Sequence, residues 1–364
     1  MKKYRGVARM RRWLAVCAII VVMSIFSGCG SATEKPQLET APTTAAAEIL
    51  ETDQQTEQTE AREEGKLYLT VSKLVLPFPG KAENIYCGTA PLESVSWMSS
   101  NSEVISVENG VVTAEAMGQV QITASLGDTT IQCDVSCLAE SQEALEALDN
   151  SVLCQPVREP PAPSDGDCTY YDDAGFVGDS VTYQLLYTPG REDRIGKPVE
   201  LFRRSASVKG FTDYFWNLTF RGREEKLEDA VAKSGVKKLF FMLGANDMGY
   251  ITVEDTMANW DTLIGRIREK SPDVEIYIES ILPSASSGQY GGTKNDKIAQ
   301  YNAELKRLAE EKNLHYVELG AYFEDSLGRL ARIYSSDGDV HITETAVYKW
   351  SSILRLFAQR QTDS

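Results

Sequence analysis

The sequence predicts an α/β domain with a parallel sheet, preceded by a small all-β sandwich. From Cys168 onward, apolar runs of strand length alternate with longer helical patterns, as in a parallel sheet covered by helices. Between residues 66 and 138 the pattern is different, because short alternating runs are separated by turn signals. Hydrophobic residues make up 42% of the 364 residues and charged residues 25%, which is typical of folded globular proteins.

Residues 1–28 are predicted to be a lipoprotein signal peptide. A basic stretch precedes an apolar run, 13–26, that is short for a membrane span. The run ends in Phe26-Ser27-Gly28-Cys29, which resembles a bacterial lipobox, although Leu is usual where Phe26 stands. The resemblance implies lipidation of Cys29 and an extracytoplasmic protein anchored to the cell membrane. A plain membrane-anchor helix and an ordinary signal peptide are the alternatives.

The charge balance argues against one class of partner. With 37 basic and 53 acidic residues, the chain carries a formal net charge of −16 and should repel nucleic-acid backbones. We therefore expect no nucleic acid partner. The seven cysteines and two histidines show no zinc-ligand spacing, so no metal is expected. Export would permit disulfides, and Cys87 with Cys133 is one possible pair.

Two linkers are expected. Residues 29–65 are rich in Ser, Thr, Ala, Glu and Gln and poor in apolar residues, which indicates a flexible linker. Residues 139–168 combine a short acidic helix with Pro160, Pro161 and Pro163, which disfavour regular structure. They separate the β-rich region 66–138 from the α/β region 169–364.

The β-rich region carries three recognisable stretches. They are Val95-Ser96-Trp97-Met98-Ser99-Ser100-Asn101, the run 107–114 around Asn109-Gly110, and the run 118–124, in which apolar and polar residues alternate. These stretches resemble a bacterial immunoglobulin-like (Ig-like) domain of group 2. The resemblance implies a spacer or a carbohydrate- or surface-binding module without catalysis. Trp97 is expected to be a core residue.

The α/β region is expected to contain at least four strands and five helices. The strand candidates are Gly175–Gly178, Lys238–Leu243, Val274–Glu279 and His315–Leu319, and the helix candidates are Ser180–Tyr187, Glu224–Ser234, Val253–Lys270, Lys294–Asn313 and Glu344–Gln359.

Ser180 is the candidate nucleophile. It follows the apolar run before Gly178-Asp179, and a strand that turns into a helix at this point holds the hydroxyl at the helix N-terminus. The helix dipole and free N–H groups favour negative charge developing there. A serine nucleophile needs such an environment. The alternative interpretation is a strand-to-helix turn capped by Asp179 or Ser180.

Asn246 and His341 are the candidate partners. Asn246 follows the apolar strand 238–243 and could donate its side-chain amide to an oxyanion. A turn or helix cap is the alternative for Asn246-Asp247. His341 lies in a polar loop before the last helix, two and four residues after aspartates, and could act as a base. A surface histidine is the alternative there, and His315 is expected to pack or to face solvent.

These three segments together resemble the blocks of the SGNH (GDSL-type) esterase family. The resemblance implies a three-layer, flavodoxin-like α/β fold with Ser180 as nucleophile and His341 as general base. It also implies an oxyanion held by the Ser180 backbone N–H, the Asn246 side chain and a glycine, for which Gly210 is the candidate although no clear signature marks it. The triad carboxylate is Asp337 or Asp339. We prefer Asp337, because a residue two positions from the histidine reaches its ring poorly.

The predicted function is a membrane-tethered serine esterase that deacetylates carbohydrate or cell-wall glycan through a Ser-His-Asp triad, without a cofactor. Its expected partners are an acylated carbohydrate or small ester and the membrane at Cys29. An O-acyltransferase acting on a glycan and a non-catalytic wall-binding lipoprotein are the alternatives. Tyr250, Trp260 and Tyr290 could line a sugar-binding cleft or serve as packing residues.

Overall fold

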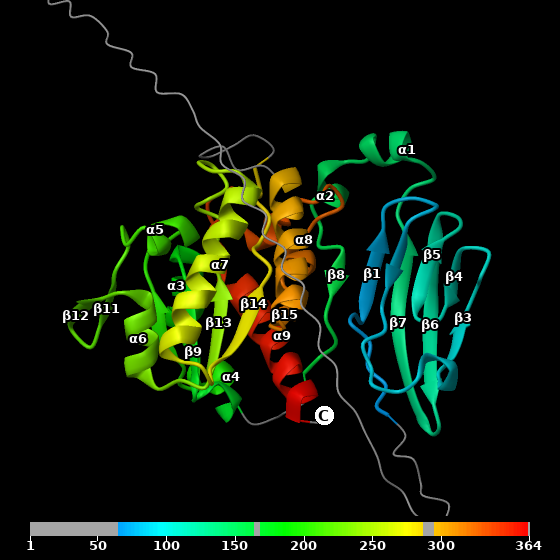
Figure 1. Ribbon diagram of the computed structural model, residues 1–364. Helices are drawn as coiled ribbons and strands as arrows, with labels where there is room; N and C mark the ends of the chain where they lie inside the picture. Colours follow the sequence, from blue (N-terminus) through cyan, green and yellow to red (C-terminus); the bar gives the residue numbers. More distant parts are fainter. Residues whose placement is uncertain (1–64, 164–167, 287–294, 363–364) are drawn as a thin grey trace, which may run out of the picture. The chain divides into compact units, whose positions relative to one another are not determined.

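The computed structural model describes residues 65–163, 168–286 and 295–362, and it contains an all-β part followed by an α/β part (Figure 1). The predicted signal peptide, the predicted lipidation site Cys29, residues 29–64 of the predicted linker and Tyr290 lie outside these residues. None of the helices described in these ranges is long and apolar enough to cross a bilayer.

The β-rich part contains two sheets. One has the strand order β3-β6-β7-β1-β8, and the other has the order β2-β5-β4. Val120, Ile122 and Ala124 are buried on alternate positions of one strand, as predicted from their spacing. Asn109 and Gly110 both have positive φ (49° and 79°), so they form the tight turn expected between two strands. The strands are β1 (Lys73–Leu76), β2 (Ala82–Asn84), β3 (Ser96–Ser99), β4 (Ile105–Glu108), β5 (Val111–Ala114), β6 (Gly118–Leu126) and β7 (Thr129–Cys137), with η1 at Leu92–Ser94.

The Ig-like identity of this part stays a prediction. Trp97 is half-buried against the core, and its ring meets Tyr86 edge-on at 6.0 Å between centroids. Cys87 and Cys133 are both free thiols, so the possible disulfide between them is not formed.

The segment after β7 is more ordered than predicted. It holds the short helices α1 (Gln142–Glu146) and α2 (Asn150–Leu153) and the strand β8 (Arg158–Glu159). β8 pairs antiparallel with β1 and ends directly before Pro160, which cannot donate a hydrogen bond to a sheet. The prolines limit this strand to two residues but do not exclude it.

A five-stranded parallel sheet forms the centre of the α/β part. Its strand order is β10-β9-β13-β14-β15, so the strand that comes first in the chain lies between the second and the third. This is the flavodoxin-like order, and the point where the order reverses lies between β9 and β13. The strands are β9 (Ala174–Gly178), β10 (Val199–Phe202), β13 (Lys238–Met242), β14 (Glu275–Glu279) and β15 (His315–Val317), with a separate hairpin of β11 (Leu218–Phe220) and β12 (Arg223–Glu225).

Helices cover both faces of this sheet, which gives the three layers that the sequence predicts. Phe240 and Phe241 are neighbours on β13 and point to opposite faces, where Phe240 meets Phe357 and Phe241 meets Trp260. Helices α3 and α4 pack with α9 on the first face, and α5, α6 and α8 pack with α7 on the second (Figure 1). The helices are α3 (Ser180–Tyr187), α4 (Glu192–Ile195), α5 (Val208–Thr212), α6 (Leu227–Ser234), α7 (Val253–Lys270), α8 (Asn295–Glu311) and α9 (Glu344–Thr362), with η2 (Thr169–Tyr171), η3 (Gly320–Phe323) and η4 (Arg332–Tyr334).

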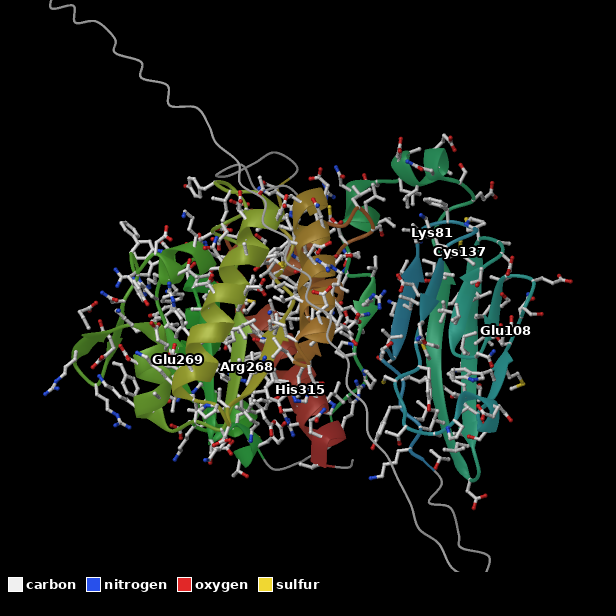
Figure 2. The ribbon with its side chains drawn as sticks, in the orientation of Figure 1. Lys81, Glu108, Cys137, Arg268, Glu269 and His315 are labelled. Carbon is white, nitrogen blue, oxygen red and sulfur yellow. The ribbon has the colours of Figure 1, made fainter. Side chains whose placement is uncertain are left out.

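A column of four stacked rings crosses the sheet. Phe176, Phe240, Tyr277 and His315 stand directly opposite one another on β9, β13, β14 and β15. Their centroids are 5.1, 4.4 and 4.3 Å apart, with interplanar angles of 12° to 13°. His315, labelled in Figure 2, ends the column on the exposed edge strand. It therefore both packs and faces solvent.

Among the differences from the sequence prediction, one helix starts later than expected and one edge strand was missed. The helix expected at Glu224–Ser234 begins only at Leu227, because 223–225 pair with 218–220 in the hairpin. The edge strand β10 was not predicted, since it has only four residues and directly follows Pro198.

Candidate functional site

Ser180 and Asn246 lie beside each other at the carboxyl edge of the sheet. Ser180 is the first residue of α3, directly after β9, and Asn246 follows the adjacent parallel strand β13. Ligands of open α/β sheets bind at the point where the strand order reverses. Both predicted residues therefore lie where this fold offers a binding crevice.

A chain of hydrogen bonds joins Ser180, His341 and Asp337. The Nε2 atom of His341 is 3.1 Å from Ser180 Oγ, and its Nδ1 atom is 2.6 Å from Asp337 Oδ2. The main-chain N–H of His341 also donates to Asp337 Oδ1, at 3.3 Å. With Nδ1–H donating to the carboxylate, Nε2 is left to accept the serine proton. The structure thus brings together the serine, the histidine and the preferred aspartate.

Asp337 is held in its ionised form. Partial burial alone would raise its pKa, but hydrogen bonds from the His341 side chain and from the main chain of Asp339 and His341 outweigh burial, and the pKa lies below its ordinary value. Gly338 follows with φ +78°, a left-handed conformation that glycine adopts without strain. This turn allows a carboxylate four positions before the histidine to reach its ring.

The alternative aspartate, Asp339, is not the partner of His341. Its Oδ1 atom accepts a hydrogen bond from Ser284 Oγ at 2.5 Å, and its main-chain oxygen accepts from the N–H of Ala285 at 2.9 Å. Asp339 therefore fixes the loop that carries His341, called the histidine loop below, to the segment after β14.

Asp179 connects the helix that carries Ser180 to Asn246. One carboxylate oxygen accepts from the N–H of Val181 at 2.9 Å and caps α3, as the alternative interpretation of this turn anticipated. The other accepts from Asn246 Nδ2, also at 2.9 Å. Only 3% of Asp179 is exposed, and this burial raises the pKa of its carboxyl to about 6.

Asn246 and Asp247 fix the neighbouring loop to the end of β13. The second N–H of the Asn246 amide donates to the carbonyl of Ala206 at 2.9 Å. The buried carboxylate of Asp247 accepts from the N–H groups of Val208 and Lys209, at 2.7 and 3.0 Å, which caps α5. The capping alternative thus holds for Asp247, while Asn246 contacts the Ser180 motif.

Gly210 lies inside α5, and its N–H donates to Ser207 Oγ at 3.0 Å. The N–H expected to serve an oxyanion is therefore engaged within its own helix. Position 210 requires glycine for packing, because a Cβ atom there would lie 1.8 Å from Cδ1 of Trp216.

Gln184 holds the main chain beside His341, and the sequence analysis missed it. Its Nε2 donates to the carbonyl of Ile342 at 2.8 Å, and its Oε1 accepts from the N–H of Ile342 at 3.1 Å. Gln184 lies four residues after Ser180, so the two share one face of α3. One helix therefore carries both the serine and the side chain that anchors the histidine loop.

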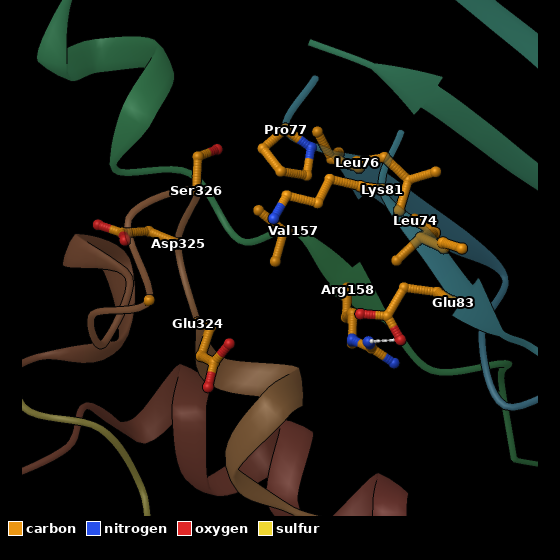
Figure 3. Close-up of a pocket in the computed structure, with 13 residues that line it drawn as sticks. Leu74, Leu76, Pro77, Lys81, Glu83, Val157, Arg158, Glu324, Asp325 and Ser326 are labelled. Atoms are coloured by element: carbon orange, nitrogen blue, oxygen red, sulfur yellow. Dashed lines mark ion pairs between the residues drawn. The ribbon is translucent and has the colours of Figure 1, made fainter. Parts of the chain in front are cut away.

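Several hollows lie in the described part of the chain outside this hydrogen-bond chain, and two of them border residues discussed here. One, of about 750 Å³, is bordered by the segment 205–216 and by residues 246–251, including Asn246 and Tyr250. The second, of about 230 Å³, is lined by residues of β1, β2, β8 and 324–328, and Figure 3 shows Arg158 paired with Glu83 there at 2.8 Å. None of the predicted site residues lines the second hollow.

The predicted aromatic residues differ in their surroundings. Tyr250 is 84% exposed, whereas Trp260 is fully buried and donates to Tyr301 in the core. Trp260 is therefore a packing residue. Within 65–163, 168–286 and 295–362, no group of three His, Cys, Asp or Glu side chains is arranged to hold a metal ion.

The sequence of the α/β part matches a known family. Residues 176–346 fit the GDSL-like lipase/acylhydrolase family, and this range includes Ser180, Asn246 and His341. These residues form a GDSL-like acylhydrolase domain. The GDSL-like domain makes the protein an ester-hydrolysing enzyme.

Solved structures provide further likenesses to the GDSL-like domain. A protein assigned as an acylhydrolase from Bacteroides fragilis NCTC 9343 is 18% identical, with a TM-score of 0.44, over 59% of this chain and 94% of its own. A GDSL-like lipase from Bacteroides thetaiotaomicron VPI-5482 is 16% identical, with a TM-score of 0.43, over 54% and 92%. An acetyl-xylooligosaccharide esterase from Geobacillus stearmophilus is 17% identical, with a TM-score of 0.37, over 51% and 93%. No curated protein matches the chain.

Proposed function

We propose that the GDSL-like domain hydrolyses esters with Ser180 as nucleophile, His341 as general base and Asp337 as the carboxylate that orients His341. One observation carries this proposal, namely the continuous path from Asp337 Oδ2 through the imidazole to Ser180 Oγ, with steps of 2.6 and 3.1 Å. Serine, histidine and carboxylate in this order form the arrangement that activates a hydroxyl for acyl transfer.

The reaction proceeds in two acyl-transfer steps. His341 Nε2 takes the Ser180 proton while Oγ attacks the ester carbonyl, and the carbonyl oxygen becomes negatively charged. The protonated imidazole then gives its proton to the departing alcohol, which leaves an acyl-serine. Water repeats the sequence on the acyl-serine and releases the acid. Asp337 stabilises the imidazolium in both steps.

The oxyanion is held by the Ser180 backbone N–H and the Asn246 amide. The first lies at the N-terminus of α3, where helix N–H groups and the helix dipole favour an anion. Both N–H groups of Asn246 already donate, to Asp179 and to Ala206, so the oxyanion replaces one of these acceptors. Gly210 stays a weaker candidate for a third donor, because its N–H would have to leave Ser207.

The proposed substrate is an O-acetylated carbohydrate or cell-wall glycan. The side chains of His341 and Asp337 are 42% and 40% exposed, so the reacting groups open to solvent and admit an ester carried on a bulky molecule. The net charge of −16 favours a neutral or cationic substrate over a polyanion. Transfer of the acyl group to a sugar hydroxyl uses the same acyl-serine and differs only in the acceptor.

The proposed location is the outer face of the cell membrane. Cys29 would carry the lipid, residues 29–65 would form a flexible tether, and residues 66–138 would be an Ig-like spacer or wall-binding module before the linker 139–168 and the catalytic region 169–364. The lipobox-like Phe26-Ser27-Gly28-Cys29 supports the lipid anchor. Incorporation of labelled palmitate by wild type and its loss in Cys29→Ser test the anchor, and equal labelling of both would refute it.

Hydrolysis of p-nitrophenyl acetate tests the catalytic assignment. We expect the Ser180→Ala variant to lose activity by several orders of magnitude. Ser352→Ala should retain wild-type activity, because this partly buried serine of α9 donates to the carbonyl of Tyr348 in its own helix. Equal rates for wild type and Ser180→Ala would refute the assignment. Acetate release from acetylated glycans tests the substrate, and product analysis with an added sugar acceptor separates hydrolysis from transfer.

A further inference from the structure

The hollow of about 750 Å³ is placed to hold the part of a substrate that continues beyond the ester. Asn246 lies on its border and also contacts Asp179, the residue before Ser180. The hollow is formed by two segments that follow β10 and β13, namely 205–216, which includes α5, and 246–251. A molecule with its ester at Ser180 can therefore extend past Asn246 into this space.

Two aromatic rings in the hollow are open to solvent. Phe215 is 73% exposed and Tyr250 is 84% exposed, and each comes from a different one of the two segments. The other two rings there contact cations, because Tyr214, which is 39% exposed, lies against Lys226 and Arg266, and the Trp216 ring packs with Arg203. Large apolar side chains gathered at one exposed place indicate a binding surface.

Polar groups surround these rings. Lys209 and Asp213 form an ion pair of 2.6 Å on the rim, and Ser205, Ser207 and Asn246 add hydroxyl and amide groups. A sugar ring has the matching chemistry, because its C–H faces pack on aromatic rings and its hydroxyls hydrogen-bond at their edges. A long acyl chain would instead desolvate these polar groups without giving them partners.

The segment that carries Phe215 is anchored by contacts on both sides of the neighbouring Tyr214 ring. Ser205 and Tyr214 are non-glycine residues with positive φ, 60° and 58°, a conformation that costs energy and is found often at ligand sites. The cations on both sides of Tyr214 and the bonds from Asp247 to the start of α5 hold this segment in place. An anchored segment loses little entropy when a ligand packs on Phe215.

We propose that this hollow is a sugar-binding subsite in which Phe215 and Tyr250 pack against a pyranose ring next to the acetylated sugar. The proposal rests on the proposed function, because it assumes that the ester-bearing sugar lies at Ser180. In this proposal, Phe215 and Tyr250 determine the specificity for a carbohydrate substrate but take no part in the acyl transfer.

Binding to an inactive protein tests the subsite apart from catalysis. In the Ser180→Ala background, short O-acetylated oligosaccharides of xylose, glucose and N-acetylglucosamine are titrated by calorimetry. We expect Phe215→Ala and Tyr250→Ala each to weaken the Kd of the bound sugar by about tenfold, a typical effect for one aromatic contact. Tyr250→Phe keeps the ring and should retain binding. Tyr348→Ala removes an exposed tyrosine on α9, outside the hollow, and should not change binding.

Kinetics on the active enzyme separate a sugar from an acyl chain. In Phe215→Ala and Tyr250→Ala, kcat/KM on acetylated oligosaccharides should fall about tenfold more than on p-nitrophenyl acetate. Loss confined to p-nitrophenyl esters with long acyl chains would overturn the proposal in favour of an acyl pocket. Unchanged Kd values, or no binding of any of the three sugars, would also overturn it.

The two proposals fail in different ways. If wild type releases acetate from a glycan and the ring variants bind and cleave equally well, the subsite is refuted and the proposed function stands. If wild type releases no acetate but the Ser180→Ala protein binds sugars through these rings, the proposed function is refuted and the subsite stands.

Discussion

Removing the Gln184 side chain tests whether α3 positions His341, the proposed general base. The Gln184→Ala variant loses both hydrogen bonds to Ile342, of 2.8 and 3.1 Å, while Ser180 and Asp337 keep their own contacts. A neutral hydrogen bond contributes about 0.5–1.5 kcal/mol, so the histidine loop loses roughly 1–3 kcal/mol of anchoring. If most of this loss displaces His341 from Ser180, kcat should fall roughly ten- to hundredfold.

The assay is steady-state hydrolysis of p-nitrophenyl acetate, combined with thermal unfolding of each variant. We expect the loss in kcat with little change in KM, because the Gln184 amide contacts the histidine loop. Gln184→Glu gives a sharper test, since an ionised carboxylate repels the Ile342 carbonyl and a protonated one can donate to it. Its activity relative to wild type should therefore rise as the pH falls. Gln142→Ala is the control, because that exposed amide donates to Glu146 on α1.

One result would refute this reasoning. A folded Gln184→Ala variant with wild-type kcat would show that the loop holds His341 without help from α3. A Gln184→Glu variant with the pH profile of wild type would lead to the same conclusion.

Three further predictions concern the two aspartates beside His341, the packing of Gly210 and the buried carboxyl of Glu279. Asp337→Asn should lower kcat roughly 10³- to 10⁴-fold while Asp339→Asn costs less than about tenfold, and the opposite order in the ester assay would contradict the site geometry. Gly210→Ala should destabilise the fold by about 1–3 kcal/mol in denaturant unfolding, because its Cβ would lie 1.8 Å from Trp216, and an unchanged midpoint would be inconsistent with that packing. Burial raises the pKa of Glu279 from 4.5 to about 7, so its protonated form stabilises the fold below pH 4.5 and this contribution is lost as the pH rises through 7. The unfolding free energy of Glu279→Gln, relative to that of wild type, should therefore rise by up to about 3 kcal/mol between pH 4 and 8. A difference between the two proteins that stays constant over this pH range would contradict the prediction.

Much of the architecture was predictable because its signals are local. The helix at Ser180–Tyr187 and the long helix at Val253–Lys270 were predicted with their observed bounds, since an apolar stripe of helical period marks both. The short edge strand β10 has no such signal, because four residues beside a proline are consistent with a loop. Its pairing with β9 depends on the sheet, which the local sequence does not show.

The side chains of the proposed site could be named from the sequence, whereas the groups that position them could not. Ser180 and Asn246 stand in motifs at strand ends, His341 stands in the loop before the last helix, and Asp337 was preferred over Asp339 from the reach of a side chain. Gln184 was missed because its partners are main-chain atoms of Ile342, which have no sequence signature.

The four-ring column has a consequence for the alignment of Ser180 with Asn246. Neighbouring strands that slipped by one residue would move by about 3.3 Å and turn their side chains to the opposite face. Such a slip between β9 and β13 would separate Phe176 from Phe240 and, at the strand ends, Ser180 from Asn246. The column and the distance between these two groups therefore depend on the same register. The aromatic circular dichroism of the column should therefore report, at a distance from the Ser180 hydroxyl, whether Ser180 and Asn246 keep their relative positions.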